Sequence, residues 1–241
     1  MLDIVAVPVL TDNYVWLIHN AESGETAVVD PSVADPVLEA AAARGWRLTQ
    51  ILNTHWHPDH TGGNEGIQQA TGCTIIAPAE AERVSNVDRI VHEGDRVTVA
   101  RREGVVWDIP AHTAGHIAFY FEGERKIFVG DTMFAMGCGR LFEGTAEQMY
   151  RNLRRIVALP EQVLIYCGHE YTLANARFAA YAEPGNDAVA ERLAAVSALR
   201  DEGNVTLPTS VAEELATNPF VRARDAEDFA RLRRDKDSFR S

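Results

Sequence analysis

A run of histidines and an aspartate at residues 54–60 is the part of this sequence best suited to chemistry. It reads Thr-His-Trp-His-Pro-Asp-His, and it places His55, His57, Asp59 and His60 within six residues, directly after a short apolar segment. Imidazole nitrogens and carboxylate oxygens are the ligands that zinc and similar divalent ions prefer. His55 and His57 alternate and can face one ion, while Asp59 and His60 turn towards a second. The spacing therefore predicts a metal site rather than a histidine-rich surface loop.

Three further candidate ligands each follow a strand-like run of residues. His112 follows the run 105–109, Asp131 follows 127–129, and His169 follows 164–166. Functional loops converge where strands end, so side chains from several strands can meet at one edge of a sheet. A purely structural zinc site prefers a closed cage of four ligands, often with cysteine. Seven candidate ligands therefore indicate a catalytic site instead.

The first two thirds of the chain alternate strand-like runs with helical patterns. A helix is expected over residues 35–43, and Thr145–Gln148 forms a capping box that predicts the start of a second helix. Runs rich in branched residues predict strands. These runs are residues 4–9, 15–18, 26–29, 48–53, 74–77, 96–99, 105–109, 117–121, 127–129 and 163–166.

The character of the sequence changes from about residue 172 onward. Strand patterns vanish, alanine, leucine and charged residues dominate, and a further capping box stands at Ser210–Glu213. We therefore expect a metal-binding α/β domain over residues 1–169 and a small helical domain over residues 170–241.

Composition narrows the class of protein. The 241 residues carry a net charge of −12, which counts against a nucleic-acid partner, and they contain no apolar run long enough for a membrane span and no secretory signal. Cys73, Cys138 and Cys167 are too few and too scattered for a disulfide framework, which fits a reducing, cytoplasmic location. Cys138 and Cys167 lie near motif residues and could be ligands or nucleophiles, but we expect small buried packing residues.

The ligand order resembles that of the metallo-β-lactamase superfamily. Within it, several stretches resemble glyoxalase II, the hydroxyacylglutathione hydrolase family, and together they span nearly the whole chain. These stretches are residues 11–14, 54–60, 137–145, 167–172 and 218–220, and the tail 233–239. The resemblance implies an α+β fold, a four-layer αββα sandwich followed by a small C-terminal all-helical domain.

The resemblance also implies a centre with two divalent metal ions. One ion is held by His55, His57 and His112, a second by Asp59, His60 and His169, and Asp131 bridges the two. We expect zinc, although iron and manganese are compatible with the same ligands. His116 is expected to be structural rather than a ligand.

The implied reaction is hydrolysis of the thioester S-D-lactoylglutathione to D-lactate and glutathione, the second step of methylglyoxal detoxification. A hydroxide shared by the two ions attacks the carbonyl, and the ions stabilise the oxyanion. The leaving thiolate is stable near neutral pH, so no separate general acid is needed. Asp59 is expected to orient the hydroxide as well as to bind metal.

The carboxylates of glutathione require basic partners. The resemblance assigns substrate binding to a set of basic and aromatic residues, namely Arg140, Phe142, Tyr171, Arg233 and Lys236. The family commonly has Lys at position 140 and Tyr at position 142. Arg can serve a carboxylate at least as well as Lys, whereas Phe142 lacks the hydroxyl contact.

Alternative functions stay open at this point. A lactonase or β-lactamase, or a mononuclear iron persulfide dioxygenase, shares much of the ligand motif, whereas a nucleic-acid enzyme would need a basic groove. The helical C-terminal part with its basic tail favours the thioesterase. Nothing in the sequence requires more than a monomer, and we expect one.

Overall fold

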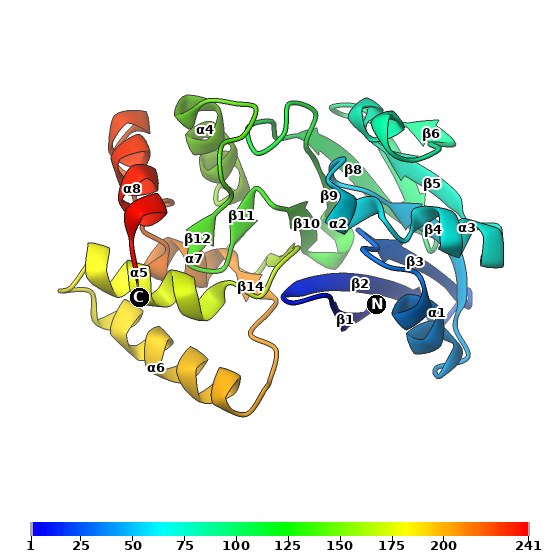
Figure 1. Ribbon diagram of the computed structural model, residues 1–241, viewed down its shortest axis with the longest axis horizontal. Coiled ribbons are helices and arrows are strands. Elements are labelled where there is room, and N and C mark those ends of the chain that lie inside the picture. Colours follow the sequence, from blue (N-terminus) through cyan, green and yellow to red (C-terminus); the bar gives the residue numbers. More distant parts are fainter. Residues whose placement is uncertain (1, 241) are drawn as a thin grey trace. The chain divides into compact units, whose positions relative to one another are not determined.

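A computed structural model describes residues 2–240, which form two compact units. The first unit runs up to residue 108 and includes residues 115–130. The second unit comprises residues 109–114 and the chain from residue 131 onward. Figure 1 shows the elements of both units, coloured along the sequence.

The first unit contains a mixed six-stranded sheet in the order β1-β2-β3-β4-β5-β6. Strands β1 to β3 are antiparallel neighbours, whereas β3, β4, β5 and β6 run parallel. Parallel neighbours need a crossover, and the helices α1 and α3 provide two of them. The bounds are β1 Asp3–Val9, β2 Asn13–Asn20, β3 Glu25–Val29, α1 Asp35–Ala42, β4 Arg47–Leu52, α2 Pro58–Thr61, α3 Asn64–Thr71, β5 Thr74–Ala77 and β6 Arg89–Ile90.

The core of this sheet is apolar. Val15, Leu17, Val28 and Ile51 are fully buried and pack in one cluster with Ile67 of α3. Along a strand every second side chain lies on the same face of the sheet, so Val15 and Leu17 point to the same side. This packing fixes the end of β4, from which the histidine motif continues.

Strands β7 to β10 of the first unit pair as an antiparallel series. Val105 lies opposite Tyr120, and Phe128 lies opposite Phe119, with Phe119 and Phe128 almost completely buried. The bounds are β7 Arg96–Val99, β8 Arg102–Asp108, β9 Ile117–Phe121 and β10 Lys126–Gly130, and short 3₁₀ turns lie at η1 Ala79–Arg83 and η2 Glu122–Glu124.

The second unit is mainly helical. Helix α5 packs on α6, as Figure 1 shows, and α4 packs on α8. The two predicted capping boxes begin α4 and α7, with both reciprocal hydrogen bonds formed in each. The bounds are β11 Met133–Phe134, β12 Gly137–Cys138, α4 Ala146–Ile156, β13 Leu164–Cys167, α5 Thr172–Ala182, α6 Asp187–Asp201, β14 Thr209–Ser210, α7 Val211–Thr217 and α8 Ala226–Ser238.

The predicted strands and the helix over 35–43 are confirmed, with small shifts at their ends. The expectation that strands stop near residue 172 is wrong in one place, because Thr209–Ser210 form the short strand β14 beside β13. Two residues are too few for an alternating pattern to reveal. The division at residues 169 and 170 stays a prediction.

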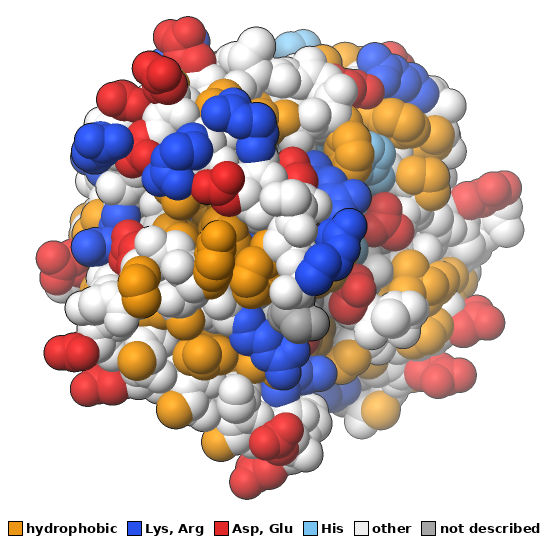
Figure 2. Space-filling view, turned by 60° about the vertical axis from the view of Figure 1, so that its left-hand side comes forward, with side chains coloured by type: hydrophobic (Ala, Val, Ile, Leu, Met, Phe, Trp, Pro, Cys, Tyr) orange, Lys and Arg blue, Asp and Glu red, His pale blue; other side chains and the backbone are white. Residues whose placement is uncertain are grey.

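The molecular surface carries charges of both signs. The face in Figure 2 shows Lys and Arg side chains together with acidic and hydrophobic side chains. Among the helices described for residues 2–240, none is both long and apolar enough to cross a membrane.

Candidate metal centre

The histidine motif occupies the loop that follows β4 and the short helix α2. The buried Asn53 side chain donates to the His60 carbonyl at 2.8 Å and so closes this loop. His55 and His60 are buried, whereas the Asp59 side chain is 39% exposed. The local fold therefore shields the His55 and His60 imidazoles from solvent and leaves the Asp59 carboxylate in partial contact with it.

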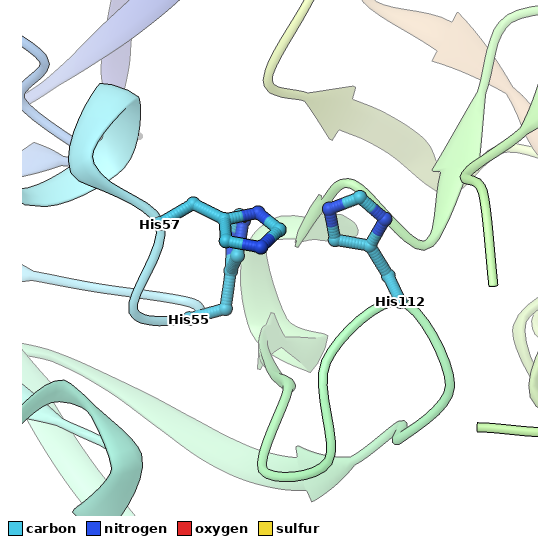
Figure 3. Close-up of side chains that lie close together, drawn as sticks. All are labelled: His55, His57 and His112. Atoms are coloured by element: carbon cyan, nitrogen blue, oxygen red, sulfur yellow. The ribbon is translucent and has the colours of Figure 1, made fainter. Parts of the chain in front are cut away.

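Donor atoms of the motif lie close together within the first unit. His55 Nε2 is 3.1 Å from His57 Nδ1, and His60 Nε2 is 3.5 Å from Asp59 Oδ2. Asp30, His55 and His60 offer three further donor atoms that lie within 4.8 Å of one another. Figure 3 shows His55 and His57 projecting from the loop before α2, and His112 projecting from the loop that follows β8.

The second unit gathers the other three predicted ligands. Asp131 Oδ2 lies 3.4 Å from His112 Nε2 and 3.3 Å from His169 Nε2. One carboxylate therefore faces two imidazole nitrogens that come from loops 57 residues apart in the sequence (169 − 112). This is the arrangement that a bridging carboxylate needs.

These spacings fit metal ligands better than hydrogen bonds. Ligands about 2.0–2.2 Å from a tetrahedral ion lie about 3.3–3.6 Å from one another. A charge-assisted hydrogen bond between imidazole and carboxylate is shorter, at about 2.7–2.9 Å. The carboxylate–imidazole distances among the predicted ligands are 3.3 Å for Asp131–His169, 3.4 Å for Asp131–His112 and 3.5 Å for Asp59–His60. The donor set thus fits divalent ions.

Residues outside the motif orient these ligands. Asp30 Oδ2 accepts from His60 Nδ1 at 3.1 Å, and the carbonyl of Arg140 accepts from His112 Nδ1 at 2.9 Å. Each contact leaves the Nε2 lone pair for an ion, as is usual around metal-bound histidines. Asn13 donates to Asp59 Oδ2 at 3.0 Å.

The sequence did not assign roles to Asp30 and Asn13. Asp30 stands directly after β3, at the same end of the parallel sheet as the histidine motif after β4. That placement is the signal that could have identified it.

His116 is fully buried. Its ring stacks on His55 at 4.6 Å, and its Nδ1 lies 3.0 Å from the carbonyl of Ile117. These contacts agree with the structural role expected for it.

Gly139 allows the chain to pass close to Asp131. A Cβ atom at position 139 would overlap the Asp131 carbonyl oxygen. The Gly139 amide also donates to the Thr132 carbonyl at 3.2 Å. Only glycine fits this close approach, so the segment after β12 depends on it.

The second unit also holds the five residues expected to bind substrate. A cavity of about 550 Å³ is lined by Arg140, Phe142 and Arg233, with Phe142 60% exposed. Tyr171 lies beside a ligand instead, stacked on the His169 ring at 4.7 Å. Lys236 does not line this cavity, and its ammonium donates to the Ala174 carbonyl at 2.9 Å.

The two basic residues of α8 that are expected to bind substrate differ in their environment. Arg233 is buried and donates to the Cys138 carbonyl and to Asp237, at 3.0 and 2.8 Å, while its Nε has no partner among the described residues. Burial first, and then the nearby Arg233, lower the pKa of Lys236 to about 8. The ammonium of Lys236 therefore loses its proton in a range that an assay can reach.

The three cysteines are free and buried, as expected. Burial raises the pKa of the Cys138 thiol to about 11, and it raises the pKa of the Cys167 thiol as well. Neither is a thiolate near neutral pH, which argues against a cysteine nucleophile.

The fold and the donor set define a member of the metallo-β-lactamase superfamily, and the model of that superfamily matches residues 9–169. The fold is accordingly an α+β sandwich. Residues 170–239 match the model described as the hydroxyacylglutathione hydrolase C-terminus. The chain therefore belongs to the hydroxyacylglutathione hydrolases, or glyoxalase II family.

Relatives of similar length support this assignment. The chain is 51% identical to a hydroxyacylglutathione hydrolase of Methylococcus capsulatus, over 100% of both chains. It is 47% identical to one of Erythrobacter litoralis, over 99% of this chain and 100% of that one.

Solved structures share the fold at lower identity. The structure of ETHE1 from Myxococcus xanthus has a TM-score of 0.75 at 25% identity and covers 100% of this chain and 92% of its own. The BLEG-1 B3 metallo-beta-lactamase has a TM-score of 0.71 at 17% identity, over 91% of this chain and 99% of its own, which shows the fold alone.

Proposed function

We propose that this protein is a metal-dependent thioester hydrolase that converts S-D-lactoylglutathione to D-lactate and glutathione, the second step of methylglyoxal detoxification. The observation that carries the proposal is the identity of about half of all residues, over the full length, with proteins named hydroxyacylglutathione hydrolase. The match of residues 170–239 to the C-terminal model of that family favours it over other hydrolases of the superfamily.

Two divalent ions are proposed to bind these ligands. His55, His57 and His112, the three imidazoles drawn in Figure 3, are assigned to the first ion. Asp59, His60 and His169 are assigned to the second ion, and Asp131 to both. The spacing of 3.3 and 3.4 Å from Asp131 Oδ2 to two imidazoles supports the bridging assignment. Zinc is the proposed metal, and iron and manganese suit the same donors.

When bound, two such ions lower the pKa of a water towards neutrality and polarise the thioester carbonyl. Asn13 donates to Oδ2 of Asp59 and so fixes the orientation of the Asp59 carboxylate. In that orientation we propose that Asp59 can accept a hydrogen bond from the attacking hydroxide. The glutathione thiol leaves as a thiolate that is stable near neutral pH, so the chain needs no acid to protonate it.

Substrate binding is assigned to the second unit. Arg140 and Arg233 line one cavity, and a guanidinium group suits the carboxylates of glutathione. The Arg233 Nε, which is buried without a partner among the described residues, supports a role in binding an anion. Lys236 is assigned as a further cation for the substrate, and Phe142 and Tyr171 offer aromatic contacts.

The proposed setting is a monomer in the cytoplasm. Three free cysteines fit a reducing compartment, and all the assigned ligands come from one chain. The net charge of −12 argues against a nucleic-acid partner.

The experiment that tests the proposal follows the loss of thioester absorbance from S-D-lactoylglutathione. The protein is assayed as purified, after chelation and after zinc is restored. We expect rapid turnover that chelation abolishes and zinc restores. No turnover by fully metallated protein would contradict the proposal, and oxygen uptake with glutathione persulfide would then test the dioxygenase alternative.

A further inference from the structure

Glu214 of α7 holds a carboxylate that is fully buried and accepts from four donors. An ionised carboxylate has about four acceptor sites, so this group is saturated. The four partners are the Met136 amide, the Asn218 side chain, the Thr209 hydroxyl and the Arg192 guanidinium, which supplies the opposite charge. Burying a carboxylate costs free energy unless all its hydrogen-bonding sites are satisfied. The four partners therefore show which segments Glu214 connects.

One oxygen of Glu214 holds the hairpin that follows Asp131. Oε2 accepts from the backbone amide of Met136 at 2.9 Å and from the side chain of Asn218 at 2.7 Å. The same Asn218 amide donates to the carbonyl of Gly137 at 3.0 Å. Met136 has a φ of +58°, which is uncommon for a residue with a side chain, and these contacts keep the hairpin in that conformation.

The other oxygen holds the strand beside the one that leads to His169. Oε1 accepts from the Thr209 hydroxyl at 2.6 Å and lies 2.9 Å from Arg192 Nη1. Thr209 belongs to β14 and lies opposite Ile165 of β13. Strand β13 ends at Cys167, two residues before His169.

We infer that Glu214 is a positioning residue that ties the segment after Asp131 to the strand pair before His169, and thereby sets the spacing of these two ligands. The inference rests on the proposed function, which assigns both ligands to the second ion. The Asp131–His169 distance of 3.3 Å is the quantity that Glu214 controls.

A merely stabilising role explains the arrangement less well. Buried ion pairs add little net stability compared with well-packed apolar residues. A hydrophobic side chain could fill this volume, but it could not accept from the Met136 amide and the Thr209 hydroxyl at once. The carboxylate is therefore suited to fixing the position of the hairpin after Asp131 relative to strand β14.

The test is Glu214→Gln, which keeps the shape of the side chain and removes one acceptor oxygen. The amide nitrogen then either faces the Met136 and Asn218 donors and breaks that tie, or takes the Oε1 place, where the Arg192 contact is lost and the Thr209 hydroxyl must reverse to accept. Zinc affinity is measured by competition with a chromophoric chelator, alongside kcat and KM. We expect the second zinc equivalent to bind roughly 10- to 100-fold more weakly, with a lower kcat and a nearly unchanged KM.

Val211→Ala is the matched control, since Val211 is fully buried in the same helix and makes none of these hydrogen bonds. It should lower the melting temperature and leave both zinc affinities within twofold. Equal weakening of zinc binding in Val211→Ala and Glu214→Gln would overturn the inference, as would unchanged affinity in Glu214→Gln.

A milder variant covers the case in which Glu214→Gln fails to fold. Thr209→Val removes only the hydroxyl on the Oε1 side, and it should weaken the second zinc equivalent several-fold. Unchanged binding in that variant would overturn the inference. Fewer than two tightly bound zinc ions on the unsubstituted protein would contradict the two-ion assignment itself, and with it this inference.

Discussion

Replacing Asp30 by Asn should weaken the binding of one zinc ion without removing any of the proposed ligands. The Asp30 side chain is 3% exposed, and its two oxygens accept from three donors. Oδ1 accepts from the Thr54 amide at 2.7 Å, and Oδ2 accepts from the Thr54 hydroxyl at 2.7 Å and from His60 Nδ1 at 3.1 Å. An amide has only one oxygen for these three donors.

The backbone decides which way the new amide turns. The Thr54 N–H cannot rotate, and leaving it without an acceptor costs about 1–3 kcal/mol, so the oxygen of the substituted side chain must stay on that side. The amide nitrogen then faces His60 Nδ1. His60 avoids two facing donors by carrying its proton on Nε2, and this proton occupies the lone pair that the ion needs.

The expected loss follows from this change of tautomer. Outer contacts of metal-bound histidines are worth roughly 10- to 100-fold in affinity or activity. This corresponds to about 1.4–2.8 kcal/mol at 25 °C. Asp30→Asn should therefore bind its second zinc equivalent weakly and lose activity at low zinc, with recovery as zinc is raised.

The assay is competition for zinc between each variant and a chromophoric chelator. Asp95→Asn is the control, because Asp95 also lies near a histidine, 3.8 Å from His92 Nδ1, and that histidine is exposed and no ligand. Zinc affinities within twofold of the unsubstituted protein are expected for the control. The same result for Asp30→Asn would refute the reasoning.

Three further predictions concern the second unit. Gly139→Ala should lower the free energy of unfolding by about 3 kcal/mol, or the melting temperature by about 6–12 °C, because the new Cβ meets the Asp131 carbonyl. Gly123→Ala is the control, since the space around Gly123 is open, and its melting temperature should change little in the same thermal scan. The pKa of Lys236 is about 8, so its ammonium is present below that pH and lost above it. KM should therefore rise above pH 8. Lys236→Met should raise KM about tenfold at pH 7 and flatten this pH dependence. If the variant keeps the pH profile of the unsubstituted protein, Lys236 does not bind the substrate. Phe142→Tyr should lower KM about two- to tenfold by adding one hydrogen-bond donor, and an equal or higher KM would contradict contact with the substrate.

The proposed ligands could be picked out from the sequence because each one follows a strand. Strand periodicity identifies where β4, β10 and β13 end, and the histidines and aspartates there are uncommon enough to be noticed. The predicted helix starts at Thr145 and Ser210 were right for a similar reason, since a capping box is a local pattern.

The contacts that orient the ligands could not be predicted in this way. Asp30 lies 30 residues from His60, and the carbonyl of Arg140 lies 28 residues from His112. A backbone carbonyl carries no side-chain signal at all, and one buried aspartate resembles any other in sequence. Glu214 was visible only as part of a helix that follows a capping box, while its partners at residues 136 and 209 come from distant segments.

The two orienting contacts also differ in charge, and this difference has a chemical consequence. His60 donates to the carboxylate of Asp30, whereas His112 donates to the neutral carbonyl of Arg140. A carboxylate partner strengthens an imidazole ligand more than a carbonyl does, so we expect His60 to be the stronger of these two proposed ligands. Asp59 and Asp131 add further negative charge to the proposed second ion, while the first has three imidazoles and shares only Asp131. The second ion therefore sits among more negative groups, and losing the charge of Asp30 should affect it before the first.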